Sequence, residues 1–418
     1  MLPTRLKICL LLLLPLVAMS AWGLSLIWSY EAHLPAPVNT SQFASSVALN
    51  GNLGLVGSSP QTAVLYQAPP PNTPLPPHLW LKVQQFVPQS GATGLFGRAV
   101  ALDVDRLAIG APYGDPQLVN NGYVDLYERS GSSWSFVQKV VPTSFDTPPP
   151  LHPELFFGDL MVLKGDTLIV GSQHFYDTAG RVFVFERNGG LFNQTQQLKP
   201  PIDVRETAFG GAIALSGDTL AIGRGGRGGA GSGPNGMDEP LVAGEVHVYV
   251  RSNGLWVVQQ VLTAPDGEVS NEFGRALDLH GNRLVVRSKT AVYLFVRSGG
   301  VWTSPWQHAV TGSPTAGVVL RPSGVKTTED DLFVGNPNKS LGPGLESAGH
   351  VLRFTGAPSG PGFVAHGSLQ DPSPTSNARF GQSLSASGDR LLVGAPSTVV
   401  AETRARVFRA QMPRRVSP

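Results

Sequence analysis

Residues 96–112 read FGRAVALDVDRLAIGAP, and residues 380–396 read FGQSLSASGDRLLVGAP. Both stretches open on Phe-Gly, continue with alternating apolar residues, cross a short polar turn and end at Gly-Ala-Pro. Five more stretches follow the same pattern with changes: FASSVALNGNLGLVGSS from Phe43, FGDLMVLKGDTLIVGS at 157–172, FGGAIALSGDTLAIGR at 209–224, FGRALDLHGNRLVVRS at 273–288 and AGVVLRPSGVKTTEDDLFVGNP at 316–337. The chain therefore contains seven copies of one unit, and internal repetition is its main structural signal.

Two further apolar segments follow each copy except the last. The first opens on Gly and alternates, as in the segments Gly122 to Tyr127 and Gly244 to Tyr249. The second opens on an aromatic residue and has a mostly apolar residue six positions later; the pairs are Trp80/Phe86, Trp134/Val140, Phe192/Leu198, Trp256/Leu262, Trp302/His308 and Phe363/Leu369. Period-two alternation broken by turn residues is typical of short antiparallel strands. Each unit thus predicts a four-stranded antiparallel sheet, whose strands we name A to D in chain order.

One such sheet cannot bury both of its faces, so repeated sheets of this size stack around an axis. The seventh unit lacks a D strand, because only a short tail follows Val407 and Phe408. The missing pattern occurs at the other end of the chain, in WSYEAHL at 28–34. We therefore expect one all-β domain over residues 28–410, a seven-bladed β-propeller of four-stranded antiparallel blades. Its ring is expected to close through this N-terminal strand in the last blade, and residues 411–418 are expected to form a basic tail.

The composition agrees with a β-rich fold. Gly (49) and Pro (36) together make about a fifth of the 418 residues, and both disrupt the interior of helices. Hydrophobic residues make 41% of the chain, which is enough to bury a large core. The formal net charge is +2, and it falls to zero without Arg5 and Lys7. A neutral domain lacks the basic surface that nucleic-acid binding requires, so no nucleic-acid partner is expected.

The N-terminal segment has the composition of an export signal. Arg5 and Lys7 precede an uncharged, leucine-rich stretch that is followed by small residues. We expect residues 1–24 to be a signal peptide that is cleaved between about residues 20 and 25. The alternative is an uncleaved signal anchor, which is the only basis for expecting contact with a membrane. The one cysteine, Cys9, lies in this segment. The domain is therefore predicted to contain no disulfide and to be secreted, periplasmic or displayed at the cell surface.

The repeated unit resembles the FG-GAP repeat, which builds the seven-bladed propeller in the head of integrin α subunits and in many bacterial exported proteins. The resemblance rests on the copies at 96–112 and 380–396, which carry Phe-Gly and Gly-Ala-Pro together, and on the presence of seven units. It covers about residues 28–410. The short A–B turns make the chain more similar to the bacterial exported type than to the integrins. The resemblance implies a propeller that binds partners through the loops at one end of its ring.

Integrin-like repeats often hold calcium in an acidic A–B loop, because calcium needs about six to eight oxygen ligands. Most A–B turns here offer a single acid, and Asp103 and Asp105 lie in a turn too short to wrap an ion. The long A–B loop ends in Glu329, Asp330 and Asp331, which form the one candidate cation site. A solvated acidic loop is the alternative interpretation of these three residues. Apart from calcium at this site, no cofactor is expected.

No catalytic residues are predicted. The chain contains no Gly-x-Ser-x-Gly, no His-Glu-x-x-His and no phosphate-binding Gly-Lys-Ser/Thr sequence. Residues 223–228 read GRGGRG, which has the spacing of a dinucleotide-binding loop but leads into a strand rather than a helix. We interpret it as a mobile surface loop, and the proline-rich stretch 68–79 as an extended C–D connection. Repeated aromatic residues such as Trp134 and Trp256 are interpreted as packing residues rather than as platforms for sugars.

Loop lengths indicate which end of the ring binds a partner. The A–B and C–D turns lie at one end and are mostly short. The B–C and D–A loops at the other end are longer and irregular: 112–121, 141–156, 223–243, 263–272, 335–348 and 396–404. Binding residues tend to occur on variable loops held by a rigid scaffold. We therefore expect an exported, non-enzymatic propeller that binds or adheres to a protein or a glycan through the B–C and D–A loops. The alternatives are an exported hydrolase or lyase with its site at the mouth of the central channel, and an architectural component of a cell envelope.

Overall fold

The computed structural model describes residues 27–37, 42–58, 61–70, 73, 75–76, 78–89, 94–114, 122–143, 156–172, 180–201, 208–226, 242–267, 272–310, 316–321, 330–356, 362–397 and 403–411. Within these ranges the chain consists of strands, turns and irregular connections, without a helix. The described segments accordingly offer no helix that has the length and apolarity needed to cross a bilayer. The predicted signal peptide and residues 412–418 of the predicted tail lie outside the described residues.

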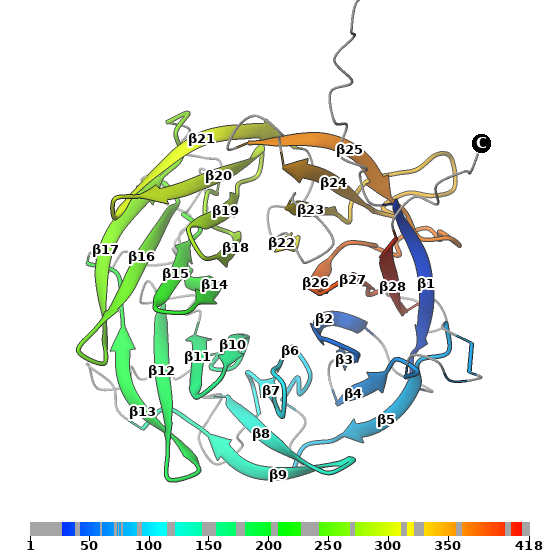
Figure 1. Ribbon diagram of the computed structural model, residues 1–418, viewed down its shortest axis with the longest axis horizontal. Coiled ribbons are helices and arrows are strands. Elements are labelled where there is room, and N and C mark those ends of the chain that lie inside the picture. The colour runs from blue at the N-terminus through cyan, green and yellow to red at the C-terminus, as the bar shows by residue number, and fades with distance from the viewer. Residues whose placement is uncertain are drawn as a thin grey trace, which may run out of the picture.

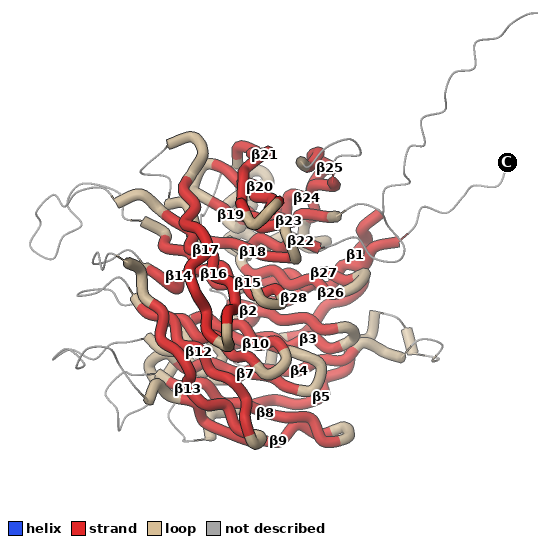
Figure 2. Tube along the Cα trace, turned by 60° about the vertical axis from the view of Figure 1, so that its left-hand side comes forward, coloured by secondary structure: helices blue, strands red, loops and turns tan. Residues whose placement is uncertain are grey.

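The described strands form seven sheets of four antiparallel strands each. The sheets are arranged as blades around a central axis (Figure 1). Figure 2 shows the blades from the side, with turns and loops at the ends of the strands. The predicted all-β, seven-bladed propeller is therefore confirmed, including the four-stranded antiparallel blades.

The strands of each blade are given from the innermost outward. Blade 1 contains β2 (Phe43–Asn50), β3 (Leu53–Ser58), β4 (Thr62–Gln67) and β5 (Leu81–Phe86), and blade 2 contains β6 (Ala99–Leu102), β7 (Arg106–Ala111), β8 (Tyr123–Ser130) and β9 (Ser133–Val140). Blade 3 contains β10 (Leu160–Lys164), β11 (Thr167–Ser172), β12 (Arg181–Asn188) and β13 (Leu191–Leu198), and blade 4 contains β14 (Phe209–Ser216), β15 (Thr219–Arg224), β16 (Glu245–Ser252) and β17 (Leu255–Thr263). Blade 5 contains β18 (Ala276–His280), β19 (Arg283–Arg287), β20 (Ala291–Ser298) and β21 (Val301–Ala309), and blade 6 contains β22 (Val318–Arg321), β23 (Asp331–Asn336), β24 (His350–Gly356) and β25 (Phe363–Leu369). Blade 7 contains β26 (Ser383–Ser387), β27 (Arg390–Ala395), β28 (Arg404–Gln411) and β1 (Ile27–Pro35).

Blade 7 takes its strands from both ends of the described chain. Its three inner strands come from the last repeat, and its outermost strand is β1. This strand pairs antiparallel with β28 over its whole length, with Trp28 opposite Ala410 and Leu34 opposite Ala405 (Figure 1). The Trp28 ring also packs edge to face on Phe333 of blade 6, with ring centroids 4.9 Å apart. The N-terminal strand thus contacts the last two blades.

The hydrophobic core is divided among the blade interfaces. Seven clusters of buried apolar residues are present in the described part of the chain, and each lies between two adjacent blades. The phenylalanine of Phe-Gly belongs to these clusters. Phe273, for example, is fully buried and contacts Tyr293 and Phe295 of its own blade, at centroid distances of 5.4 and 5.9 Å. The following residue, Gly274, has φ of 90°, a backbone conformation that residues with a Cβ rarely adopt.

The two glycines of the repeated motif meet across the blade interfaces. A Cβ built on Gly110 of blade 2 would lie 2.0 Å from the carbonyl oxygen of Gly158, in the Phe-Gly turn of blade 3. A Cβ on Gly223 of blade 4 would lie at the same 2.0 Å from the carbonyl oxygen of Gly274 in blade 5. Phe-Gly and the glycine of Gly-Ala-Pro therefore let neighbouring blades approach backbone to backbone.

A glutamine on the outermost strand ties each of the first four blades to the next. Gln196 accepts a hydrogen bond from the N–H of Trp256 and donates one to its carbonyl, both at 2.9 Å. The same pair of bonds joins Gln84 to Trp134, Gln138 to Phe192, and Gln260 to Trp302. The aromatic residue that opens each of these D strands is thus held by its backbone as well as by its buried ring.

A carboxylate is buried in the apolar cluster between blades 1 and 2. Asp125 lies on β8 between Tyr123 and Tyr127, and the alternation of the strand places these three side chains on one face. Asp125 has 0% exposure. Burial raises its pKa to about 6, although the positive charge of Lys139 on the neighbouring strand favours the ionised form. The folded protein therefore binds a proton here more tightly than the unfolded chain does.

Stability is expected to depend on pH through Asp125. The folded state raises this pKa from 3.8 to about 6, so the cost of ionisation is absent below about pH 4, grows as the pH rises to about 6 and is complete above it. We expect Asp125→Asn to raise the free energy of unfolding by about 2 to 3 kcal/mol at about pH 8 and to change it little at about pH 4. Urea unfolding at the two pH values measures the difference.

A suitable control is Asp105→Asn, because the Asp105 side chain is 60% exposed. Its effect on the free energy of unfolding should be small and similar at both pH values. If Asp125→Asn behaved like this control, the argued cost of ionising Asp125 would be wrong.

Candidate functional site

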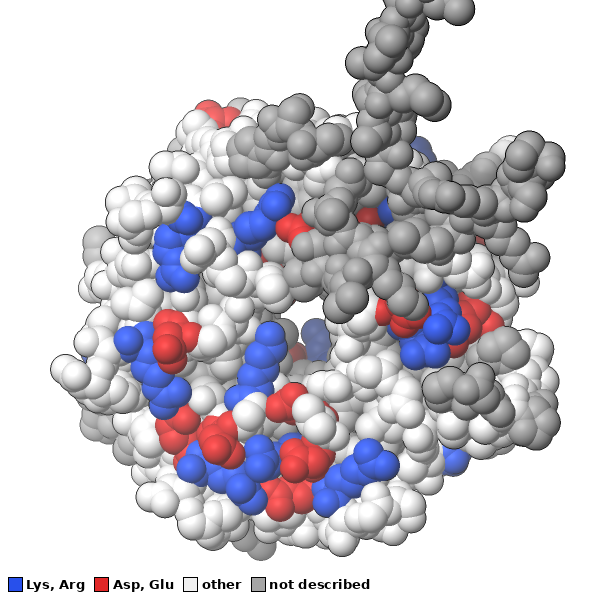
Figure 3. All heavy atoms as spheres, viewed as in Figure 1, with Lys and Arg blue, Asp and Glu red and all other residues white. Residues whose placement is uncertain are grey.

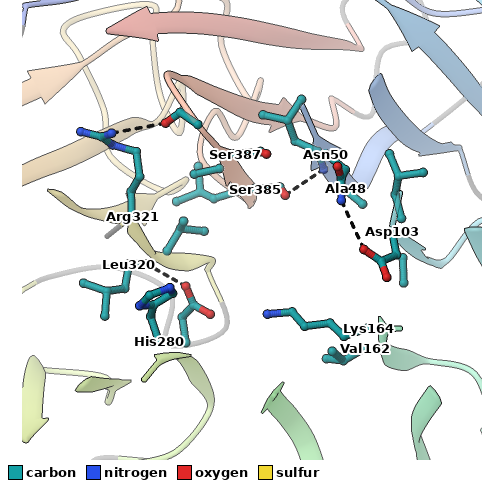
Figure 4. Close-up of a pocket in the computed structure, with 18 of the residues that line it drawn as sticks. Ala48, Asn50, Asp103, Val162, Lys164, His280, Leu320, Arg321, Ser385 and Ser387 are labelled. Atoms are coloured by element: carbon teal, nitrogen blue, oxygen red, sulfur yellow. Dashed lines mark hydrogen bonds between the residues drawn. The ribbon is translucent and has the colours of Figure 1, made fainter. Parts of the chain in front are cut away.

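A cavity of about 1410 Å³ occupies the central channel at the end that carries the A–B turns. Its wall is formed by the innermost strands of six blades, β2, β6, β10, β18, β22 and β26, and by the end of β28. Figure 4 shows polar side chains from several of these strands around the cavity, including Asn50, Asp103, Lys164, His280 and Arg321. An innermost strand has no further strand on its channel side, so part of its backbone also faces this space. The cavity is therefore the main candidate for a small-molecule site in the described part of the chain.

Most of these polar side chains are used in hydrogen bonds between neighbouring blades. Ser385 of blade 7 accepts a hydrogen bond from the N–H of Leu49 in blade 1 at 2.9 Å (Figure 4). Asp103 of blade 2 accepts one from the N–H of Gly165 in blade 3 at 2.7 Å. Further bonds of this kind join Ser387 to Gly51, Ser216 to Gly281, and Arg321 to Gly388. These side chains satisfy backbone groups at the channel and hold the blades together.

Asp278 is a half-buried carboxylate in the wall between blades 5 and 6. One of its oxygens accepts a hydrogen bond from the N–H of Leu320 at 2.8 Å, and the other accepts one from the N–H of Leu279 at 2.9 Å. Burial raises the pKa of Asp278, and these hydrogen bonds and the charges of Lys164 and His280 oppose the rise. A perturbed carboxyl group in a cavity is a candidate acid or base. Here, however, both oxygens are committed to the backbone of the wall.

Two basic side chains of the wall are exposed to the channel. Lys164 ends β10 and His280 ends β18, and Figure 4 shows the amine of Lys164 extending into the cavity. Neither side chain makes a hydrogen bond or an ion pair with another described residue. They therefore leave two basic groups available to a molecule that enters the channel.

Charged side chains also gather around the channel, on the face in Figure 3 over β7, β8 and β12. Arg106 and Arg187 both contact Glu128, at 3.1 and 2.8 Å. Arg251 of blade 4 contacts Glu186 of blade 3 at 2.8 Å. The charges alternate in sign and are only partly buried, so each pair contributes little stability. These ion pairs connect blades 2, 3 and 4. Because positive and negative side chains alternate, the surface is not suited to a partner whose charges are all of one sign.

The opposite end of the ring carries a second candidate surface, which we call the blade 6 platform. It consists of residues 337–349, in the B–C loop of blade 6, and residues 371–379, in the D–A connection to blade 7. The N–H of Asn377 donates to the carbonyl of Glu346 at 2.7 Å, and two more backbone hydrogen bonds of 3.0 Å lie beside it. The two loops therefore form one hydrogen-bonded unit.

The blade 6 platform is anchored on a buried ion pair and has a polar surface. Asp371, which is 3% exposed, accepts hydrogen bonds from Arg406 on β28 at 2.9 and 3.1 Å. Arg404 of the same strand donates to the hydroxyl of Thr375 at 2.8 Å. Apart from Pro343 and Pro372, the exposed side chains of the platform are polar or charged: Asn338, Lys339, Ser340, Glu346, Ser373, Asn377 and Arg379.

In the structure, Asp330 and Asp331 of the candidate cation site bind different arginines. Glu329 lies outside the described residues. Asp330 pairs with Arg283 of blade 5 at 2.9 Å, whereas Asp331 begins β23 and is bound by Arg321 and Arg353. The described residues contain no group of three or more His, Cys, Asp or Glu side chains that could hold a metal ion. Calcium binding at Glu329, Asp330 and Asp331 stays a prediction, and two arginines already neutralise Asp331.

Two other stretches singled out in the sequence are partly described. In the glycine-rich stretch 223–228, Gly223 and Arg224 end β15, and Arg224 pairs with Glu245 at 3.5 Å. Residues 227–241 lie outside the described residues. The proline-rich stretch 68–79 lies between β4 and β5, which is the C–D connection of blade 1.

Asp278 and Ser385 are not among the residues predicted from the sequence, although the repeats contain a signal for both. These two residues occupy the same position in their copies, where Ala48, Ala101 and Ala214 stand in three others. A polar residue at an otherwise apolar position of an innermost strand indicates a hydrogen bond near the channel. The acceptor role of both side chains follows that rule.

The fold and its repeated contacts define a seven-bladed β-propeller whose blades are copies of one sequence unit. A comparison with family models matches residues 256–291 to the FG-GAP repeat, a stretch that runs from the D strand of blade 4 into blade 5. This match covers one repeat of the chain, and it agrees, together with the seven blades, with the resemblance of the repeats to the FG-GAP family. A search of curated proteins finds no match to the chain.

Proposed function

We propose that this chain is an exported, non-enzymatic propeller that binds a protein or a glycan through its B–C and D–A loops. The FG-GAP propeller is a scaffold of the binding or adhesion type. The observation that carries the finer proposal is the blade 6 platform, in which a B–C loop and a D–A connection are joined by backbone hydrogen bonds. A preformed polar surface loses little conformational freedom when a partner binds.

The channel supports a binding role better than a catalytic one. Its half-buried carboxylate, Asp278, is hydrogen-bonded to the backbone N–H groups of Leu279 and Leu320. Asp103 and Ser385 likewise bind the backbone of the next blade. Side chains that hold the ring together cannot easily move a proton or attack a substrate. Export itself rests on the composition of residues 1–24.

The proposal is tested by charge reversal on the blade 6 platform. The double variant Lys339→Glu/Arg379→Glu changes two exposed side chains of this surface. The wild-type chain is applied to an array of glycans and an array of extracellular proteins, and the spot with the strongest saturable signal is used as the probe. We expect the double variant to bind this probe about tenfold more weakly, with an unchanged melting temperature.

The matched control is Lys82→Glu/Arg129→Glu, which reverses two exposed charges at the end of the ring with the A–B and C–D turns. It should bind the probe like the wild type. Loss of binding in the control but not in the platform variant would contradict the proposed face. Absence of saturable binding on both arrays, together with stable self-assembly, would favour an architectural role instead.

A further inference from the structure

Arg287 occupies a position that is glycine in the other six repeats: Gly57, Gly110, Gly171, Gly223, Gly335 and Gly394. A Cβ at any of those glycines would collide with a backbone carbonyl of the next blade. The copy that follows Arg287 reads Ala316-Gly317 instead of Phe-Gly. Two departures from the motif therefore coincide at the interface between blades 5 and 6, and a long side chain takes the place of the usual close contact.

The guanidinium of Arg287 is fully buried and only partly hydrogen-bonded. Arg287 has 0% exposure. Its Nη1 donates to the carbonyl of Gly335 in blade 6, whereas Nε and Nη2 have no hydrogen-bond partner among the described residues. No described carboxylate forms an ion pair with it. Burial lowers the pKa of Arg287 to about 10, so the group keeps its positive charge at neutral pH.

The two unpartnered groups form one edge of the guanidinium. Nε–H and the adjacent Nη2–H point in the same direction, and this edge is the one that binds the two oxygens of a carboxylate or a single halide. A buried charge is tolerated in a folded protein when it is paired and hydrogen-bonded, and it is costly otherwise. The interface therefore contains a positive charge and two N–H donors. An anion bound there would neutralise the charge and accept both hydrogen bonds.

We infer that the Nε–Nη2 edge of Arg287 binds a compact monovalent anion, a halide or a carboxylate of the size of formate, between blades 5 and 6. Ala316, also fully buried, lacks the phenylalanine ring that fills the equivalent place in the other repeats. The anion neutralises the guanidinium and completes the interface in which Arg287 replaces the usual glycine and Ala316 the usual phenylalanine. This site goes beyond the proposed binding function and lies outside the channel cavity.

The test is thermal unfolding of the full chain at constant ionic strength, with sodium gluconate replaced stepwise by sodium chloride or sodium formate. Gluconate is too large for a buried site, so the wild type should show a saturable rise in melting temperature of about 2 to 4 °C. Arg287→Met removes the charge with little change in volume and should abolish the rise. Arg98→Met is the control, because Arg98 is 47% exposed and paired with Asp159, and it should keep the rise.

A second measurement does not depend on the folding of a variant. Crystals of the wild-type chain soaked in sodium bromide should show an anomalous peak beside Nε and Nη2 of Arg287. Arg287→Lys, which keeps a charge but lacks the two-donor edge, should lose that peak. A wild-type response identical to that of Arg287→Met, or a water molecule with no bromide at this position, would overturn the inference.

Discussion

Replacing Asp331 by asparagine is expected to lower the free energy of unfolding by about 3 to 5 kcal/mol. Asp331 is 2% exposed and accepts hydrogen bonds from two arginines that are themselves buried, Arg321 and Arg353. Asparagine keeps the shape of the side chain but removes its charge. Two guanidinium groups would then remain in the interior without a counter-charge, which costs more than the loss of a surface ion pair. Urea unfolding of the wild type and the variant measures the difference.

The effect should extend beyond blade 6. Arg321 also donates to the carbonyl of Gly388 in blade 7, at 3.3 Å, and its guanidinium lies 5.3 Å from the centroid of the Trp28 ring. Loss of Asp331 therefore weakens the contacts of blade 6 with blade 7 and with the N-terminal strand. Faster hydrogen exchange in β1 and β26 would report this weakening.

Two further variants show whether the buried charge is the cause. Asp159→Asn breaks a partly exposed pair with Arg98 and should cost about 1 kcal/mol or less. The triple variant Arg321→Met/Asp331→Leu/Arg353→Met removes all three charges and should be more stable than Asp331→Asn alone. If Asp331→Asn cost no more than Asp159→Asn, the cluster would not stabilise the fold as argued. Calcium added to the wild type would raise its stability if the acidic run also held an ion.

Gly223→Ala is expected to cost about 3 kcal/mol, because the new methyl group would meet the backbone of the next blade. A Cβ at this position would lie 2.0 Å from the carbonyl oxygen of Gly274 and 3.2 Å from the Cβ of Ala212. The carbonyl belongs to the Phe-Gly turn of blade 5 and cannot rotate away as a flexible side chain would. Blades 4 and 5 must therefore separate or bend, and the melting temperature of the variant measures the cost.

Gly217→Ala is the matched control in the same blade. Gly217 has φ of 54°, but no atom lies within 4 Å of a Cβ built on it. Its substitution should cost about 1 kcal/mol, which reflects backbone strain alone. Equal losses for the two variants would show that backbone conformation, rather than the contact between blades, explains the glycines of the motif.

The seven blades could be predicted because each repeat carries four short alternating segments with a turn after each. The turn Lys164-Gly165-Asp166 illustrates this: Gly165 has φ of 56°, the conformation that a tight hairpin needs. Even the degenerate copy at 316–337 folds into two paired strands, β22 and β23. Local alternation and turn chemistry therefore sufficed for the number and order of the strands.

At the candidate cation site, the directions of the acidic side chains could not be predicted from the local sequence. Glu329, Asp330 and Asp331 are adjacent in sequence, but successive side chains at the start of a strand point in opposite directions. Asp330 consequently reaches Arg283 of blade 5, and Asp331 reaches arginines of its own blade. The sequence of a loop gives the number of acidic residues in it. The direction in which each acidic side chain points depends on the residue at which the strand begins.

Contacts between distant segments were also beyond sequence reasoning. The blade 6 platform depends on a hydrogen bond between Asn377 and Glu346, which belong to different loops. Arg287 and Asp125 look like ordinary polar residues of strands, and their burial follows from how two blades meet. The repeats predict that blades pack against one another, but not which polar groups the packing encloses.

The pairing of β1 with β28 has a consequence for biosynthesis. Of the described strands, β1 is translated first and its partner β28 is translated last. Six blades can therefore form on the growing polypeptide before the three inner strands of blade 7 have been made. This pairing has the largest sequence separation among the described strand pairs, and contacts of this kind form slowly because a long loop must close first. Completion of the toroid is thus expected to be the last and slowest event, and deletion of either β1 or β28 would damage the same blade.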